Sequence, residues 1–277
     1  MNLGDTKLGR FESVPNEYSP NVLDRVPRCA SISHSSFFSG CDYWYVHELS
    51  WLDLNGFPLR GVATLAIPST STFMVESKSA KLYFNSFRFF VVGSQVALEE
   101  LIIKDFSSLL GCPIGCKISD FRHNIGTPDC DSIGSCLDHD PIDNISYDID
   151  SCRKYLKIDE ASQFCSLRVH TNLFLTHCPV TSQPDFATAV IDYRGLSFDV
   201  KGLMKYLISY RHSRNFNEVC CDQVFKDLLN SYSPEHLVLA LFYTSRGGIS
   251  ITPARYGGTS VDSSVLSNIL GGNIITI

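Results

Sequence analysis

The chain has 277 residues and a formal net charge of −6 at pH 7, with 23 Lys+Arg against 29 Asp+Glu. This balance, without any run of basic residues, argues against a protein that binds nucleic acid. With 44% hydrophobic and 12% aromatic residues, the chain is expected to form a real core, as one large domain or two of about 130 residues. The longest clean apolar run, at 237–243, is far shorter than the ~18 residues of a membrane helix. No secretory signal is visible, so we expect a cytoplasmic protein with no membrane partner.

Eleven cysteines are many for such a chain. Their number is odd, so they cannot all pair within one chain, and a secreted disulfide scaffold would be shorter. Most are expected to be buried apolar residues in a reducing compartment, with one or two reactive thiols. Six Cys and His residues between positions 112 and 139 are of the types that bind zinc, but their spacing matches no closed zinc site. We therefore expect no metal.

The first half of the chain predicts a β-hairpin followed by two helices. Residues 43–52 (YWYVHELSWL) and 60–67 are rich in aromatic and β-branched residues, and the Asn-Gly pair at 55–56 between them is a tight-turn signal. A short strand at 73–76 leads into the helices. Each helix is predicted from apolar residues that share one face, namely Ala80, Tyr83, Phe84 and Phe87 in the first and Leu98, Leu101, Ile102 and Leu109 in the second.

The second half repeats this order. Residues 166–176 and 187–193 predict a second hairpin, and strands at 237–243 and 249–251 are expected to close the unit. The two helices between them are again predicted from apolar residues on one face, namely Leu203, Tyr206, Leu207 and Tyr210 in the first and Cys221, Val224, Phe225 and Leu228 in the second.

The two halves also match residue by residue. KLYFNSFR ends at Arg88 and MKYLISYR at Arg211; Asp105 follows the first by 17 residues and Asp227 follows the second by 16. These matches favour an internal duplication, and chance similarity of amphipathic helices is the alternative. Antiparallel strands with helices packed on one face make the fold α+β. The expected division is an N-terminal arm at 1–40, a first unit at 41–120, an Asp-, Gly- and Cys-rich connecting segment at 121–162 and a second unit at 163–277.

The sharpest candidate for chemistry is HCPVTSQPDFA, at 177–187. Cys178 follows a predicted strand and precedes a proline, so the chain leaves the sheet there and exposes the thiol. Asp185 lies seven residues further on and can fold back towards it. A cysteine nucleophile needs a thiolate and then a proton source, and this pair supplies both. A buried structural cysteine beside a turn aspartate is the alternative.

Three further segments are candidates for binding. In VESKS (75–79), Ser77 or Ser79 is a plausible N-cap, and a helix N-terminus with Lys78 suits an anion; a plain capped helix is the alternative. In SRGG (245–248), the double glycine lets backbone approach a ligand and the arginine can bind phosphate; a hairpin turn is the alternative. In RHSRNFNEVC (211–220), Glu218 can pair with the N–H edge of a purine-like ring, or simply favour the helix dipole.

Together these segments resemble the NADPH-dependent 7-cyano-7-deazaguanine reductases, the nitrile reductases of queuosine biosynthesis. The resemblance runs from HELSWL (47–52) through VESKSAKLYFNSF (75–87) and CPVTSQPDFA (178–187) to RHSRNFNE and SRGG, in the order typical of the family. Each block alone is weak evidence for the family, but the occurrence of all of them in one chain is specific to it. The arrangement is similar to the long form of the family, with two tunnelling-fold repeats per chain. Neither a Rossmann nor a Walker A sequence is present.

The resemblance implies a mechanism and a set of residue roles. A cysteine adds to the nitrile carbon to give a covalent thioimide, an aspartate donates a proton, and two NADPH per turnover complete the reduction to the amine. The product would serve tRNA modification without contact between this acidic protein and tRNA, and the fold implies at least a homodimer. The implied roles are nucleophile for Cys178, proton donor for Asp185, substrate contacts for Val75, Glu76, Ser77, Asn217 and Glu218, and NADPH contacts for Ser77, Lys78, Arg246 and Gly247.

One position departs from the family. A histidine normally precedes the ring-anchoring glutamate, and here the residue is Asn217, which can donate a hydrogen bond but cannot exchange a proton near neutral pH. Two other functions remain open: a tunnelling-fold pterin or purine hydrolase and, because of Asn217, a non-catalytic ligand-binding homologue. Cys220 lies two residues beyond Glu218. If Glu218 touches the substrate, the Cys220 sulfur is expected to approach Cys178, and the two can form a reversible disulfide.

Overall fold

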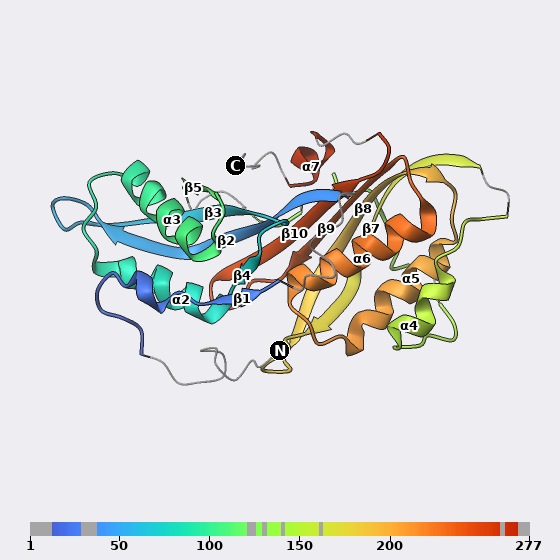
Figure 1. Cartoon of the computed structure of the whole chain (residues 1–277), viewed down its shortest axis with the longest axis horizontal. Coiled ribbons are helices and arrows are strands. Elements are labelled where there is room, and N and C mark those ends of the chain that lie inside the picture. Colours follow the sequence, from blue (N-terminus) through green and yellow to red (C-terminus); the bar gives the residue numbers. More distant parts are fainter. Residues whose placement is uncertain are drawn as a thin grey trace.

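One long sheet forms the centre of the molecule (Figure 1). The computed structural model describes residues 13–28, 38–120, 126–128, 132–139, 142–160, 163–260 and 264–270. Within them the sheet has eight strands, and all neighbours are antiparallel except the last two. In spatial order these strands are β5 (Gly115–Ser119), β3 (Pro58–Pro68), β2 (Phe38–Leu52), β10 (Ile249–Gly257), β9 (His236–Tyr243), β8 (Pro184–Leu196), β7 (Phe164–His177) and β6 (Ser135–Cys136).

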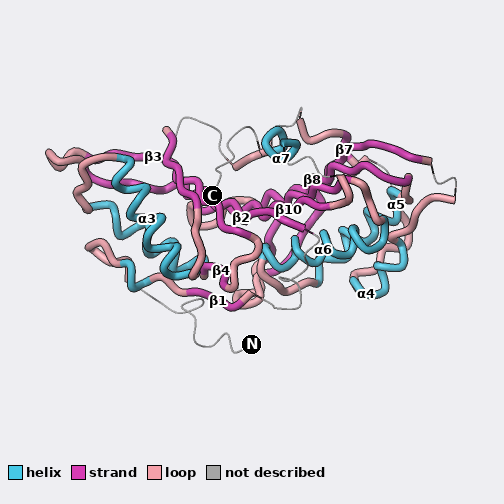
Figure 2. Tube along the Cα trace, turned by 45° about the horizontal axis from the view of Figure 1, so that its top comes forward, coloured by secondary structure: helices cyan, strands magenta, loops and turns pink. Residues whose placement is uncertain are grey.

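The four long helices cover one face of this sheet, and Figure 2 shows a short C-terminal helix on the opposite side of the strands. The long helices are α2 (Ser77–Asn85), α3 (Gln95–Leu110), α5 (Val200–Ser209) and α6 (Asn217–Tyr232), and the short ones are α4 (Ile149–Cys152) and α7 (Ser264–Ile269). Two apolar cores lie under the long helices, one in each half of the chain. A third core lies on the other face, where α7 packs through Leu266 and Ile269. Among the helices that the structure describes, α7 is the one that departs from the expected one-sided packing.

The apolar stripes predicted for the first helix of each repeat are buried, but α2 and α5 end before the last residue of their stripes. Tyr83 and Phe84 lie in α2, whereas Phe87 lies in the 3-10 turn Ser86–Phe89 that follows it. The same change occurs after α5, where Tyr210 begins the 3-10 turn Tyr210–His212. A tighter last turn satisfies carbonyl groups that a helix end otherwise leaves unpaired.

The internal duplication has a clear structural counterpart. The Tyr83 hydroxyl donates to Asp105 Oδ2 over 2.7 Å, and the Tyr206 hydroxyl donates to Asp227 Oδ2 over 2.6 Å. Each pair joins the first helix of its unit to the second, beside a hairpin of two long strands. The fold is therefore α+β, with two tandem tunnelling-fold repeats.

Strand β10 joins the two repeats. It pairs with β9 on one side and with β2 on the other. The sequence predicts a strand only at 249–251, because Pro253 and Arg255 interrupt the apolar pattern. Arg255 is nevertheless fully buried, since Asp42 and Asp222 neutralise its charge.

Part of the expected N-terminal arm packs against the first repeat. β1 (Arg25–Pro27) pairs with β4 (Phe73–Val75), and the Tyr18 hydroxyl donates to Asp105 Oδ2 over 2.5 Å. A strand of three residues is too short to show a sequence period, which is why the pattern did not predict β1. The remaining arm positions, 1–12 and 29–37, lie outside the described residues, as do 121–125, 129–131, 140–141 and 161–162 of the connecting segment.

Candidate active site

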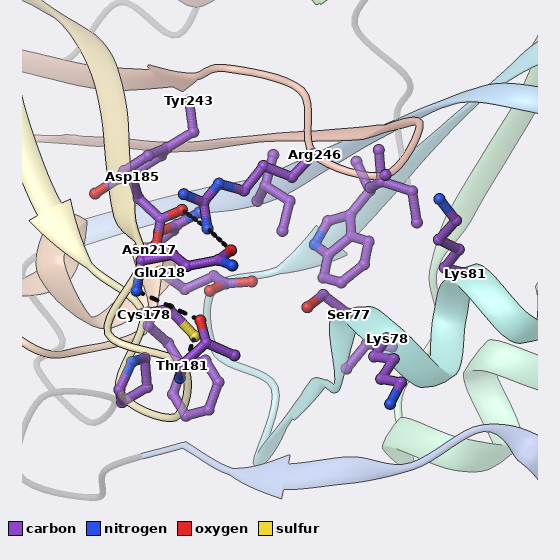
Figure 3. A pocket seen from close by; sticks show the side chains of 18 of the residues that line it. Ser77, Lys78, Lys81, Cys178, Thr181, Asp185, Asn217, Glu218, Tyr243 and Arg246 are labelled. Carbon is purple, nitrogen blue, oxygen red and sulfur yellow. Dashed lines mark hydrogen bonds and ion pairs between the residues drawn. The ribbon is translucent and has the colours of Figure 1, made fainter. Parts of the chain in front are cut away.

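A cavity of about 260 Å³ lies where the two repeats meet. Figure 3 shows its two walls, with Cys178, Asp185, Asn217 and Glu218 on one side and the start of α2 on the other. Of the ten residues to which the sequence assigns a role, nine line the cavity and Glu76 does not. Those nine are Val75, Ser77, Lys78, Cys178, Asp185, Asn217, Glu218, Arg246 and Gly247.

The hairpin between β7 and β8 presents the Cys178 thiol to the cavity. β7 ends one residue earlier, at His177, and the loop closes through two backbone bonds: Cys178 N–H to Gln183 O (2.9 Å) and Ser182 N–H to Cys178 O (3.0 Å). Within this loop the Thr181 amide points at Cys178 Sγ over 3.5 Å. This contact orients the sulfur within the loop, and a cysteine nucleophile reacts as its thiolate.

Asp185 opens β8 beside this loop and is 9% exposed. Burial raises the pKa of its carboxyl, while the charges of Arg246 and His177 act in the opposite direction. Arg246 Nη1 lies 3.0 Å from Asp185 Oδ1, and the same guanidinium donates to Gln183 Oε1 and to Pro184 O. A buried carboxyl with a raised pKa suits a general acid.

The start of α2 differs from the expected cap. Ser77 and Ser79 do not cap the helix; Glu76 is the N-cap, and its carboxylate accepts from Lys78 N (2.8 Å) and Ser79 N (2.7 Å). The two backbone N–H groups compensate in part for the burial that raises the Glu76 pKa. The Glu76 side chain is fully buried under the helix, so it fixes the position of Ser77 and Lys78 rather than lining the cavity.

The start of α6 supplies Asn217 and Glu218. They are the first two residues of the helix, and Glu218 is 4% exposed. Burial is the largest cause that raises the pKa of Glu218 to about 7; Asp42 raises it further, and Arg28 and Arg255 lower it. Near neutral pH the Glu218 side chain is therefore present both as the neutral acid and as the carboxylate. Hydrogen bonds from the N–H edge of a ligand would favour the carboxylate.

The SRGG segment is both a tight turn and part of the cavity wall. Arg246 and Ile249 exchange two backbone bonds around Gly247 (φ +57°) and Gly248 (φ +80°). Positive φ at both positions is typical of a two-residue hairpin turn. A Cβ at Gly247 would come within 2.8 Å of Lys81 Nζ, so the glycine leaves room for that cation.

Sequence reasoning gave no role to eleven of the twenty residues that line the cavity. Among them, Lys81 lies four residues after Ser77 on α2, so the helical period was the signal that could have identified it. Thr181 and Gln183 lie inside the CPVTSQPDFA block, from which only Cys178 and Asp185 were chosen, and two strands bring in Trp44 and Tyr243.

The cysteines and possible metal ligands can be placed in part. All nine described cysteines are free thiols. Cys220 is buried and does not line the cavity; its sulfur lies 3.7 Å from Ser213 Oγ, and burial raises its pKa to about 12. Its pairing with Cys178 therefore stays a prediction. Across the described parts of the chain, no three His, Cys, Asp or Glu side chains gather as a metal site, and His123 and Cys130 lie outside them. Nor does any described helix have the length and apolar character to cross a membrane.

The fold and cavity define a chain of two tunnelling-fold repeats with a thiol at the junction of the repeats. Comparison with known families gives a more specific result. Residues 14–118 match the family described as nitrile reductase, 7-cyano-7-deazaguanine-reductase N-term, and residues 184–260 match the one described as QueF-like protein.

Individual relatives agree with these matches. The chain is 35% identical over 256 residues to the NADPH-dependent 7-cyano-7-deazaguanine reductase of Xanthomonas campestris pv. campestris (strain B100), covering 91% of this chain and 92% of the relative. It is 33% identical over 266 residues to the protein of the same name from Acinetobacter baylyi, covering 94% and 96%. The chain therefore belongs to the 7-cyano-7-deazaguanine reductase (QueF) family.

Proposed function

We propose that this protein is an oxidoreductase that uses NADPH to reduce the nitrile of 7-cyano-7-deazaguanine to 7-aminomethyl-7-deazaguanine, in the queuosine pathway. The observation that carries the proposal is one cavity that holds a loop thiol, two buried carboxyls and several cationic side chains. Family membership and the printed names of the relatives support it.

In the first step the Cys178 sulfur adds to the nitrile carbon. A new S–C bond forms, one C–N π bond breaks, and the nitrogen takes a proton from Asp185, which gives a covalent thioimide. The Thr181 N–H at 3.5 Å from Sγ orients the sulfur, which attacks as its thiolate. The raised pKa of Asp185 keeps a proton available for the nitrogen. A nitrile is a poor electrophile, and formation of a covalent adduct replaces one difficult reaction by two easier steps.

Glu218 and Asn217 are the proposed anchors of the deazaguanine ring. A carboxylate can accept two parallel N–H bonds from the ring edge, and the amide of Asn217 can donate to a ring oxygen or nitrogen. Both residues stand at the start of α6 and on the same wall as Cys178, so they would present the nitrile to the thiol.

The opposite wall suits NADPH. Lys78 and Lys81 give that side of the cavity a positive charge, Arg246 adds a cation beside Asp185 on the facing wall, and Gly247 removes a side chain that would crowd Lys81. The dinucleotide carries phosphates, which lysine and arginine bind well. When bound it supplies hydride, and conversion of a nitrile to an amine needs four electrons, hence two NADPH per product. Ser77, Lys78, Arg246 and Gly247 would hold it.

Assembly and location belong to the same proposal. Exposed apolar side chains at the β2–β3 hairpin and in the 3-10 turn after α2 favour a homodimer: Leu54 is 75% exposed, Phe57 65% and Phe89 65%. Free thiols at all nine described cysteines favour the reducing cytoplasm. The division into an arm (1–40), a first repeat (41–120), a connecting segment (121–162) and a second repeat (163–277) stays a proposal, testable by limited proteolysis.

The deciding experiment follows NADPH absorbance with and without 7-cyano-7-deazaguanine. We expect oxidation only with the nitrile present, at two NADPH per nitrile. A ratio of one to one would contradict the mechanism. Without NADPH, intact-mass measurement should detect a nitrile adduct. A hydrolase would instead turn over a pterin or purine without NADPH, and a binding homologue would bind the nitrile with neither adduct nor oxidation.

A further inference from the structure

A closed ring of four buried charges lies behind the first turn of α6. Arg255 contacts Asp42 Oδ1 through Nη2 (2.8 Å) and Asp222 Oδ1 through Nε (2.6 Å). Arg28 contacts the other oxygen of each carboxylate, through Nη2 to Asp42 and through Nη1 to Asp222 at 3.3 Å. All four residues are at most 5% exposed. Positive and negative groups alternate, so the ring as a whole is neutral.

The ring joins four segments that are distant in sequence. Arg28 belongs to the N-terminal segment, Asp42 to β2, Asp222 to α6 and Arg255 to β10. Both arginines also donate hydrogen bonds to backbone oxygens. Arg28 Nε donates to Ser71 O and Arg255 Nη1 donates to Cys41 O, each over 3.2 Å. Buried ion pairs seldom stabilise a fold more than apolar residues of the same size would. Packing alone therefore does not account for four charges at this junction.

Glu218 is the group that the ring faces. Glu218 precedes Asp222 by one helical turn, so the ring is attached to α6 one turn after Glu218. Three ring members act on Glu218 through their charge: Asp42 disfavours its ionised form, whereas Arg28 and Arg255 favour it. Two other titratable groups lie near Glu218. They are the buried Cys220 thiol on α6 and the carboxyl of Asp185, which lines the same side of the cavity.

We propose that Arg28, Asp42, Asp222 and Arg255 are positioning residues for Glu218: the ring holds the first turn of α6 against the sheet and sets the charge that Glu218 presents to the substrate. The inference rests on the proposed role of Glu218 as the anchor of the deazaguanine ring. Glu218 without the ring would be a buried, isolated carboxyl, which favours the protonated form. With two arginines and one aspartate acting on it, the group can ionise when a ring N–H edge arrives.

The proposal predicts that substitution of a ring arginine and substitution of a ring aspartate shift the pH dependence of substrate binding in opposite directions. Affinity for 7-cyano-7-deazaguanine would be measured by calorimetry from pH 5.5 to 8.5, in a Cys178→Ala background that prevents the adduct. The affinity should fall below a midpoint near 7, the pKa of Glu218. Arg28→Gln should move this midpoint up by about one unit, and Asp42→Asn should move it down by about one unit.

Arg153→Gln is the matched control. Arg153 Nε lies 2.7 Å from Asp227, on the same helix α6 but more than two turns beyond Glu218. Its loss removes an ion pair from that helix without changing the charge around Glu218. It should therefore leave the midpoint unmoved.

Several outcomes separate the inference from the function on which it rests. Ring variants that fold by near-ultraviolet circular dichroism yet leave the midpoint unmoved, or move it in one common direction, overturn the inference. Unchanged affinity in Glu218→Gln, in the same background, overturns the anchor role of Glu218 instead. Should one ring variant fail to fold, ¹³C NMR of the glutamate-labelled wild type and of the other ring variant decides, with Glu218→Gln for assignment. A Glu218 carboxyl that titrates at the same pH in both proteins would exclude an influence of the ring.

Discussion

Arg246 Nη1 lies 3.0 Å from Asp185 Oδ1, so one guanidinium links the proposed proton donor to the proposed NADPH contact. As long as this pair is intact, Arg246 favours the ionised form of Asp185 and opposes the effect of burial. A cofactor phosphate that attracts Arg246 away would raise the pKa of Asp185. Asp185 would then take up its proton when NADPH is bound.

Arg246→Gln should therefore raise the pKa of Asp185 by about one unit and also raise the KM for NADPH. The limb of the pH–rate profile that reports Asp185 should move to higher pH. Lys81→Gln is the control, because it removes a cation from the same cavity without a contact to Asp185. We expect it to raise the KM for NADPH and leave that limb in place. A limb that stays in place in Arg246→Gln would show that the pair has no influence on the acid.

Removal of Cys178 should abolish both the adduct and turnover. Of the nine described cysteines, it is the one that lines the cavity, and its sulfur receives the Thr181 N–H. Intact mass after incubation with the nitrile alone measures the adduct, with Cys220→Ser as the control. An adduct retained in Cys178→Ala would assign the nucleophile to another cysteine.

Asp185→Asn should still place the adduct on Cys178 but slow its formation, and with it NADPH oxidation, by roughly 10²–10⁴, the usual contribution of a general acid. The asparagine keeps the size of the side chain and removes the transferable proton. Steady-state NADPH oxidation and the time course of the adduct mass measure the two steps separately. A near-normal kcat would exclude Asp185 as the proton donor.

Glu218→Gln should weaken substrate binding by about 2–4 kcal/mol, because it removes a buried charge-assisted pair to the ring edge. Calorimetry at pH 8 measures this loss in the Cys178→Ala background. Unchanged affinity would leave Glu218 only the ordinary role of an acidic residue at a helix start.

The same variant should gain stability at high pH. The folded state raises the Glu218 pKa from 4.5 to about 7, so the native protein binds the proton more tightly than the unfolded chain. The unfolding free energy therefore falls as the pH rises through this window, by up to about 3 kcal/mol. Urea unfolding should show Glu218→Gln more stable than wild type at pH 8 and equal to it at pH 4. A constant difference between the two pH values would contradict the raised pKa.

The long elements and the duplication could be predicted from the sequence because each carries a period. The stripe that includes Tyr83 and the one that includes Tyr206 identified α2 and α5, and the structure adds that the matched Asp105 and Asp227 accept hydrogen bonds from these tyrosines. Alternation and turn signals identified the two long hairpins. These signals are local, so a single sequence suffices to detect them.

Other features depend on contacts that no local pattern records. β1, β6 and α4 have at most four residues each, too few to show a period. The second half of β10 was missed because a buried Arg255 resembles a surface residue until its partners Asp42 and Asp222 are known. At the site, motif matches identified nine of the lining residues, whereas the cap made by Glu76 and the approach of Trp44 required coordinates.

Asn217 provides the last prediction. It is the first residue of α6 and lines the cavity next to Glu218, at the position where the sequence resemblance implies a histidine in the family. If that position mainly orients the substrate, an amide donor already serves, and Asn217→His should change kcat little. We favour this outcome, because Asp185 is in place and the N-terminal end of a helix disfavours a protonated imidazole. The test compares the pH–rate profiles of wild type and Asn217→His, with adduct formation and NADPH oxidation followed separately. A rise of about tenfold or more in kcat, with a new ionisation near the ordinary histidine value of about 6.5, would show a proton relay instead. Faster adduct formation alone would place the effect on activation of the Cys178 thiol.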